Sequence, residues 1–219
     1  MWSCQEVESR RPYRSSLRDE QARTTRRAIV ETGAALFVER GYAGTTVDAI
    51  AERARVSRKT VFTSVGGKVG LLKLAFDWAL VGDDEPVPFS DRPVVRELLQ
   101  ETDPQKVVEK WAHLVTGIAA RIALLHPVLV AAADADEQAA ALNEVSERNR
   151  MGGATNFVEQ LRGLGALRSD LSVERAAAMA SVLMDPLGYR RLVLGDGWTD
   201  DEYADWVVRM TAASFLPDQ

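Results

Sequence analysis

The stretch from Thr45 to Leu72 constrains the fold most, because it combines two short helical patterns with a tight turn between them. Thr45 followed three residues later by Asp48 is a capping-box pattern, which predicts where the first helix starts. Its apolar side chains recur at the spacing of a helix that packs on one side: Val47, Ile50, Ala51 and Ala54. Ser57 is a favourable N-cap for a second helix over residues 58–64. The pattern therefore predicts a helix-turn-helix.

The second helix of this motif is short, basic and rich in hydroxyl groups. Val61 is expected to point into the core, which leaves outward the side chains of Arg58, Lys59, Thr60 and Thr63. Hydrogen-bond donors of this kind suit phosphate groups and base edges. A basic run of this length is also common as a plain solvated surface, so the motif alone leaves both interpretations open.

The motif is embedded in a longer series of residues at fixed spacings. The series comprises Phe37-Val38-Glu39-Arg40-Gly41-Tyr42, Thr45-Thr46-Val47, Ile50-Ala51, Ala54, Val56-Ser57, Lys68 and Leu71-Leu72. It resembles the DNA-binding domain of TetR-family transcriptional regulators over residues 20–80. The resemblance implies an all-α fold, with an N-terminal three-helix helix-turn-helix domain and a C-terminal antiparallel helical domain for ligand binding and dimerisation. It also implies a sequence-specific DNA-binding regulator, namely a repressor that a small-molecule effector releases from DNA.

Nine residues of the motif are expected to contact DNA. They are Thr46, Arg55, Ser57, Arg58, Lys59, Thr60, Phe62, Thr63 and Lys68. Arg55 stands where the family usually has glycine, so it is expected to adopt a left-handed backbone conformation at a cost of about 1 kcal/mol. Phe62 stands where tyrosine is common, which leaves a ring that can only pack on sugar or on a thymine methyl group. Lys68 lies near a helix N-terminus, where backbone N–H groups also attract phosphate.

Charge and composition divide the chain into three segments. We expect a disordered basic arm over residues 1–20, the DNA-binding domain over residues 21–82, and an effector-binding and dimerisation domain over residues 83–219. Residues 1–73 contain 14 Lys and Arg against 8 Asp and Glu, a net charge of +6, whereas residues 74–219 contain 13 against 24, a net charge of −11. The positive first third predicts that nucleic acid binds there.

An effector pocket is expected between the long helices of the second domain. Its predicted lining is Trp111, Val115, Asn149, Phe157, Met184 and Tyr189. Basic residues are not in excess in this domain, so we expect the effector to be small, mostly apolar, and neutral or cationic. Aromatic and Met side chains at helical spacing also suit a closed core, which is the alternative for these positions.

The last helical pattern starts with a capping box formed by Thr199 and Glu202. Its apolar positions are the candidates for a homodimer interface: Tyr203, Trp206, Val207 and Met210. In TetR-family proteins the final helices of two subunits form a four-helix bundle. The resemblance therefore implies a homodimer that reads the two half-sites of a pseudo-palindromic duplex DNA. The alternative is that these side chains complete a core within one chain.

Motifs for catalysis, metal binding or cofactor binding are not found in the sequence. His113 and His126 are the only histidines, and neither has Cys or Glu neighbours at metal-ligand spacing. A Gly-x-Ser-x-Gly elbow, a P-loop and a Gly-x-Gly-x-x-Gly phosphate cradle are also missing. We therefore expect neither an enzyme nor a bound cofactor or metal.

The single cysteine, Cys4, fits a reducing compartment. Apolar runs fall short of the roughly 20 residues of a membrane span, so we expect a cytoplasmic protein that does not contact a membrane. The remaining alternative for the function is an all-helical protein-interaction module, whose basic first third would bind an acidic protein without specific DNA binding.

Overall fold

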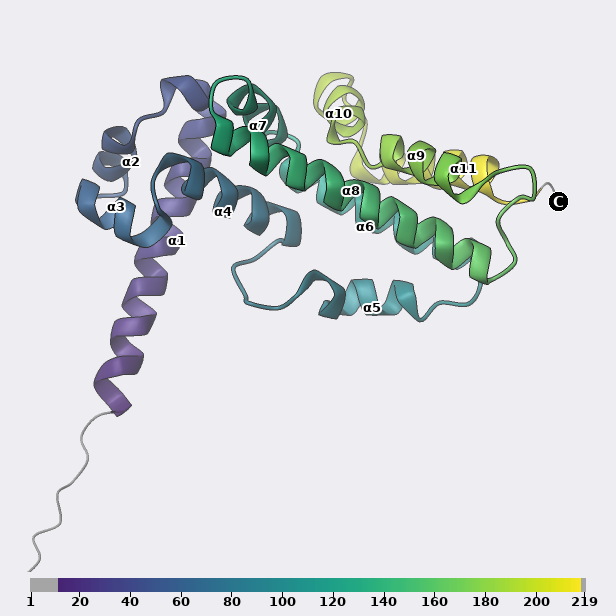
Figure 1. Ribbon diagram of the computed structural model, residues 1–219, viewed down its shortest axis with the longest axis horizontal. Helices are drawn as coiled ribbons and strands as arrows, with labels where there is room; N and C mark the ends of the chain where they lie inside the picture. Colours follow the sequence, from purple (N-terminus) through teal and green to yellow (C-terminus); the bar gives the residue numbers. More distant parts are fainter. Residues whose placement is uncertain (1–11, 218–219) are drawn as a thin grey trace, which may run out of the picture.

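A computed structural model describes residues 12–217 of the chain, and these residues form helices and no strand (Figure 1). In chain order the elements are α1 (Pro12–Gly44), α2 (Val47–Arg53), α3 (Arg58–Val65), α4 (Lys68–Val81), the 3-10 turn η1 (Phe89–Asp91), α5 (Pro93–Leu99), α6 (Pro104–Ile122), α7 (His126–Ala133), α8 (Glu137–Gly163), α9 (Val173–Leu183), α10 (Pro186–Tyr189), the π-helical segment η2 (Arg190–Gly195) and α11 (Asp200–Phe215). The expected all-α fold is confirmed.

The first helix is longer than the sequence pattern predicts. Residues 1–11 of the expected basic arm lie outside the described residues, but α1 begins at Pro12, so the prediction of disorder was wrong for residues 12–20. The low apolar content of this segment suggested disorder. Adding a residue to an existing helix needs no new nucleus, however, and proline is favourable at the first helical position. Figure 1 shows that this part of α1 projects away from the body of the protein.

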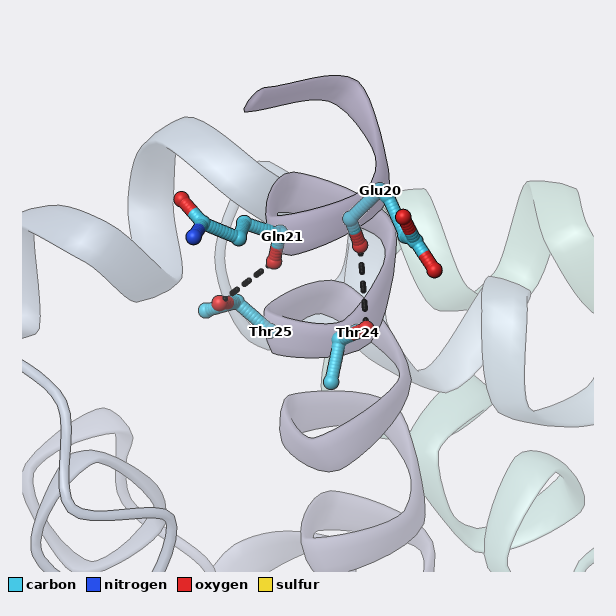
Figure 2. A pocket seen from close by; sticks show the side chains of 4 residues that line it. All are labelled: Glu20, Gln21, Thr24 and Thr25. Atoms are coloured by element: carbon cyan, nitrogen blue, oxygen red, sulfur yellow. Dashed lines mark hydrogen bonds between the residues drawn. The ribbon is translucent and has the colours of Figure 1, made fainter. Parts of the chain in front are cut away.

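Figure 2 shows a shallow, open pocket on the projecting part of α1, lined by Glu20, Gln21, Thr24 and Thr25. The hydroxyl groups of Thr24 and Thr25 donate hydrogen bonds of 2.9 Å to the backbone carbonyls of Glu20 and Gln21. The four residues all belong to one helix, and the two hydroxyls are bonded to its own backbone. The pocket therefore offers little to a ligand.

The start of α2 differs by one residue from the prediction. Thr46, not Thr45, is the N-cap, and its side chain accepts a 3.1 Å hydrogen bond from the backbone of Ala49. Thr45 is buried instead, and its hydroxyl lies 3.0 Å from the carbonyl of Leu36 and 2.8 Å from that of Gly41. Gly41, with a φ of 71°, breaks α1 and exposes these carbonyls. Thr45 therefore ties α2 to the end of α1.

The first hydrophobic core joins the helix-turn-helix to the rest of the chain. Side chains of α1 to α4 pack together with residues from the end of α6, from α7 and from the start of α8, among them Ile122, Leu125, Leu129 and Ala139. The division between residues 82 and 83 remains a prediction, but the core crosses it. At its centre, Leu71 on α4 occupies the space beside Gly33 on α1, where an added Cβ would lie 2.2 Å from a Leu71 methyl carbon.

The second hydrophobic core lies among α6, α8, α9 and α11. The rings of Trp111 on α6 and Phe157 on α8 stack with centroids 4.2 Å apart, and Phe215 of α11 meets Phe157 edge-on at 6.0 Å.

Within residues 12–217, no single helix is both long and apolar enough to cross a membrane. The helices α6 and α7 meet that test only as a pair, and this pair is bent by 64°.

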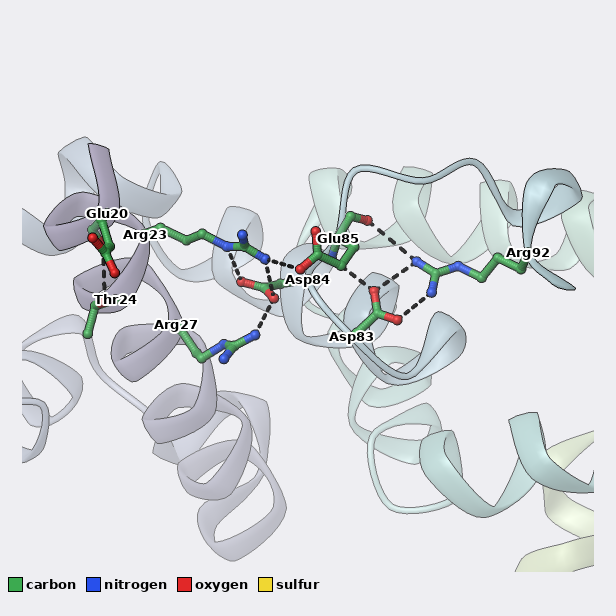
Figure 3. A network of polar contacts seen from close by, with 8 residues as sticks. All are labelled: Glu20, Arg23, Thr24, Arg27, Asp83, Asp84, Glu85 and Arg92. Atoms are coloured by element: carbon green, nitrogen blue, oxygen red, sulfur yellow. Dashed lines mark hydrogen bonds and ion pairs between the residues drawn. The ribbon is translucent and has the colours of Figure 1, made fainter. Parts of the chain in front are cut away.

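Ion pairs connect the exposed face of α1 to the segment that follows α4 (Figure 3). The guanidinium of Arg23 donates to both carboxylate oxygens of Asp84, at 3.1 and 2.9 Å, and to Glu85 at 2.7 Å. Arg27 also pairs with Asp84, whose side chain is only 3% exposed. The hydrogen bonds from Arg23 and Arg27 hold the pKa of Asp84 far below its usual value.

We predict that Gly33→Ala and Gly152→Ala have opposite effects on stability. Over-packing against Leu71 should cost about 1–3 kcal/mol and the better helix propensity of alanine should offset about 1 kcal/mol, so Gly33→Ala should lose up to about 2 kcal/mol. At Gly152 on α8 an added Cβ meets nothing within 4 Å, so alanine should gain roughly 0.5–1 kcal/mol. Urea denaturation at equal protein concentration measures both. Equal effects would contradict the close packing at Gly33.

We predict that the contribution of Asp84 to stability disappears in acid. Because its pKa is lower in the folded than in the unfolded chain, Asp84 stabilises the fold above its ordinary pKa, and this stabilisation is lost as the pH falls below about 4. The difference in unfolding free energy between wild type and Asp84→Asn should therefore be larger at neutral pH and shrink on acidification. Asp196→Asn, at an exposed loop position, controls for the loss of a surface charge. A difference that is constant with pH would contradict the assignment.

Candidate nucleic-acid interface

The turn of the helix-turn-helix is formed by Ala54, Arg55 and Val56. Arg55 has a φ of 55°, so the left-handed conformation expected from the sequence is confirmed. The backbone N–H of Val56 reaches back 2.9 Å to the carbonyl of Ala51 and closes the end of α2. This geometry leaves the Arg55 side chain exposed beside α3.

Ser57 begins α3 as expected, and its hydroxyl oxygen accepts a 3.0 Å hydrogen bond from the backbone of Thr60. It also lies 2.8 Å from the Thr60 hydroxyl, so these two predicted DNA contacts are hydrogen-bonded to each other. Val61 is fully buried and fixes the inner face of α3. Lys59 and Thr63 consequently lie on the exposed face.

Arg58 and Phe62 form a second group on the exposed face of α3. The Arg58 guanidinium lies 3.0 Å from Asp48 of α2 and 5.8 Å from the centroid of the Phe62 ring. Phe62 is 47% exposed. Because the Arg58 and Asp48 side chains are themselves mostly exposed, their ion pair is weak and exchanges easily for a phosphate. Thr46, the N-cap of α2, is exposed as well.

Lys68 differs from the exposed Arg55, Arg58 and Lys59 because it is partly buried. Its ammonium group lies 3.8 Å from the centroid of the Tyr42 ring, and burial lowers its pKa. The Tyr42 hydroxyl donates a 2.7 Å hydrogen bond to Asp136, the N-cap of α8. Burial and this carboxylate raise the pKa of Tyr42. Tyr42 belongs to the recognised sequence pattern, but nothing in the sequence connects it with Asp136.

A cavity of about 260 Å³ lies among α4, η1, α6, α7 and α8. Of the six predicted lining residues, only Asn149 and Met184 reach it. The other four do not line this cavity and are buried in the second core or at its edge: Trp111, Val115, Phe157 and Tyr189. The stacked rings of Trp111 and Phe157 occupy the space between α6 and α8 at their level.

Most of the cavity lining was not anticipated. The apolar lining is Phe76, Leu80, Phe89, Ile118, Ile122, Leu142, Val145, Met184 and Pro186. The polar lining is Asp77, His126, Ser146, Glu147, Asn149 and Arg150. A usable signal was present in the sequence, since Asn149 and two glycines interrupt the apolar stripe of α8. Gly153 lies at the cavity, with the Met184 methyl group 3.2 Å from where its Cβ would be.

Arg150 organises the polar end of the cavity. Its guanidinium donates to Asp185 at 2.5 Å and to Glu147 on the preceding turn of α8. His126 lies 3.9 Å from Glu147, and burial lowers its pKa below the usual value. Among the described residues, no group of three or more His, Cys, Asp and Glu side chains could hold a metal ion.

Comparison with known proteins identifies the family. The family model for bacterial regulatory proteins of the tetR family matches residues 29–75, which contain the helix-turn-helix. The relative named HTH-type transcriptional regulator YdeS of Bacillus subtilis (strain 168), itself described as uncharacterized, is 28% identical over 187 residues, which cover 84% of this chain and 86% of that protein. This chain is a TetR-family transcriptional regulator.

Solved structures of regulators share the whole TetR-family fold with this chain. NalD, the secondary repressor of the MexAB-OprM multidrug efflux pump in Pseudomonas aeruginosa, has a TM-score of 0.68 and 17% identity, covering 90% of this chain and 100% of NalD. A transcriptional regulator from Saccharomonospora viridis in complex with choline has a TM-score of 0.67 and 18% identity, covering 88% of this chain and 98% of its own. At such identities the likeness concerns the fold.

The final helices of this TetR-family chain present a smaller apolar surface than the sequence suggests. Tyr203 and Val207 are almost fully buried within the chain, which fits the alternative that they complete a core within one chain. They point toward the second core, where the Tyr203 ring meets that of Tyr189 edge-on at 5.3 Å. Trp206 is partly exposed and Met210 is 38% exposed. On the adjacent α9, Met179 and Val182 are 42% and 71% exposed.

Proposed function

We propose that this TetR-family regulator is a homodimeric repressor that binds a pseudo-palindromic operator through α3 and leaves it when a small molecule enters the cavity. The observation that carries the proposal is that α3 is held in a fixed orientation by its N-cap and its buried inner face. Ser57 caps its start, Val61 anchors its inner face, and Lys59, Phe62 and Thr63 are exposed together on its outer face. A rigid helix with donors on one exposed face suits insertion into a major groove.

The charges near α3 support binding to a polyanion. Arg55, Arg58 and Lys59 lie within five residues of one another and are exposed. Lys68 at the start of α4 adds a cation beside backbone N–H groups, where phosphate is favoured. We assign the phosphate contacts to Arg55, Arg58 and Lys68 and the base contacts to Lys59, Phe62 and Thr63. Ser57 and Thr60, with Thr46, serve mainly to cap and orient the helices.

The exposed apolar side chains of α9 and α11 support the homodimer. Met179, Val182 and Met210 lie on neighbouring helices, and their exposure to water is unfavourable in a monomer. A two-fold arrangement of these helices would form a four-helix bundle, in which each chain presents the same surface. Such a dimer places two copies of α3 on one duplex, as a pseudo-palindrome requires.

The cavity supports control by a small molecule. At about 260 Å³ it is close to the lower end of ligand-binding pockets, and a mostly apolar lining with some polar groups is typical of such pockets. α4 contributes Phe76, Asp77 and Leu80 to its wall and begins directly after α3. A ligand that binds better to one position of α4 than to another would therefore shift α3. NalD is described as a repressor and the Saccharomonospora viridis protein is solved with choline, which supports repression and small-molecule binding here.

We predict that replacing Lys59 and Thr63 with alanine abolishes sequence selection. The wild type should enrich a pseudo-palindrome from a random duplex pool, and its affinity should fall steeply as salt rises. The double variant should lose at least roughly 30-fold in affinity for the selected site, because each of the two lost base contacts costs about 1–3 kcal/mol. Thr102→Ala with Lys106→Ala, exposed near the start of α6, is the matched control. If wild type showed no preference among duplexes, a protein-interaction module that binds an acidic partner would be favoured instead.

We predict that Val182→Lys weakens the dimer. Val182 is the most exposed apolar side chain of α9, and a charge buried without a partner at an interface is strongly unfavourable. Analytical ultracentrifugation should show a lower association constant, with helix content unchanged by circular dichroism. Leu99→Lys, at a position 54% exposed on α5, should leave the association unchanged. A dimer weakened equally by both variants, or by Leu99→Lys alone, would place the interface elsewhere.

A further inference from the structure

The polar end of the cavity carries more negative than positive charge. Arg150 is bonded to two carboxylates, Glu147 and Asp185, so one carboxylate charge is not balanced within the group. Asp77 on α4 is a further carboxylate of the lining, and it pairs with Lys73, which does not line the cavity. Arg150 is the only Lys or Arg side chain among the described residues of the lining.

His126 does not compensate for this surplus. It faces Glu147 at 3.9 Å, but burial lowers its pKa, so the imidazole is mostly neutral at physiological pH. A ligand at this end of the cavity therefore meets the Glu147 carboxylate, a neutral imidazole and a guanidinium that is already paired with two carboxylates. An anionic group would meet net repulsion there, whereas a positive group would complete the charge balance.

The remaining walls favour an apolar ligand with aromatic contacts. Phe76 from α4 and Phe89 from η1 supply two rings, and aliphatic side chains of α6 and α8 complete the lining. The faces of aromatic rings attract cations as well as apolar groups. The volume of about 260 Å³ accommodates a single ring with a small ammonium group.

We propose that the cavity selects a small hydrophobic organic cation, with its ammonium group against Glu147 and its apolar body between Phe76 and Phe89. This inference rests on the proposed role of the cavity as the effector site and names the chemical class that the site takes. Glu147 is the residue that determines specificity. A neutral molecule of the same shape would fill the apolar walls but gain nothing from the carboxylate.

The test compares two molecules of the same shape that differ in charge. The pair is (4-hydroxyphenyl)trimethylammonium and 4-tert-butylphenol, titrated into the full-length protein at neutral pH in a calorimeter. The cation should bind at least roughly tenfold more tightly than its neutral counterpart, because cation–π contact and the carboxylate both act on it alone. Equal affinities, tighter binding of the neutral molecule, or no binding of the cation would overturn the proposal.

The variant Glu147→Gln tests whether the Glu147 carboxylate causes the preference for the cation. It should weaken binding of the cation by roughly tenfold and leave 4-tert-butylphenol unchanged, since only the charge of the side chain is removed. Glu144→Gln is the matched control, because Glu144 lies on the same helix with a side chain 72% exposed and pairs with Arg148. Unchanged cation binding by Glu147→Gln, or equal weakening by the control, would overturn the role of Glu147. The comparison of the two molecules on wild type does not depend on how either variant folds.

Measurements of operator binding distinguish a failure of this inference from a failure of the proposed function. If the cation makes wild type release the selected operator but does not do so for Glu147→Gln, the result supports both the proposed function and the preference for cations. Tight, Glu147-dependent binding of the cation without any change in operator affinity would overturn control by the cavity while the assigned ligand class stands. Release of the operator by both molecules with equal potency would support the effector site and overturn its preference for cations.

Discussion

The packing of the apolar face of α4 against α1 and the neighbouring helices is the interaction on which the rest of the structure depends. Leu71 packs beside Gly33 of α1 in the first core, and Phe76, about one and a half turns later, belongs both to that core and to the cavity wall. The helix begins at Lys68, next to α3, and its later turns face the cavity. One element therefore joins the proposed DNA-reading surface to the proposed ligand site, and a small shift of α4 would be shared by both.

Directional polar contacts fix how the helix-turn-helix sits on the remaining helices. Arg121 of α6 donates hydrogen bonds of 2.8 and 2.9 Å to two carbonyls at the end of α4. Asp84 pairs with two arginines of α1, and Tyr42 near the end of α1 reaches Asp136 at the start of α8. Apolar packing tolerates sliding, whereas charged hydrogen bonds have strict geometry, so these contacts select one arrangement. They lie around α4 and would resist or guide its movement.

Local features of the chain were predictable because their causes are local. The N-cap at Ser57 and the left-handed Arg55 follow from residue types within a few positions, and both are observed. Asp103 likewise caps α6, and the proline after it stands at the first helical position. The N-cap of α2 was missed by one residue because Thr45 and Thr46 are equally good caps in sequence. The choice between them depends on carbonyls that the break at Gly41 exposes.

The sequence by itself determined the helical class, the helix-turn-helix and the face of each helix that is apolar, since these depend on residue types at short spacings. Only the tertiary structure decided which apolar residues close a core and which line a void. Trp111 and Ile118 lie on the same face of α6, two turns apart, yet Trp111 stacks on Phe157 whereas Ile118 borders the cavity. Helical spacing defines a face, but what lies opposite depends on the size of side chains contributed by distant parts of the chain.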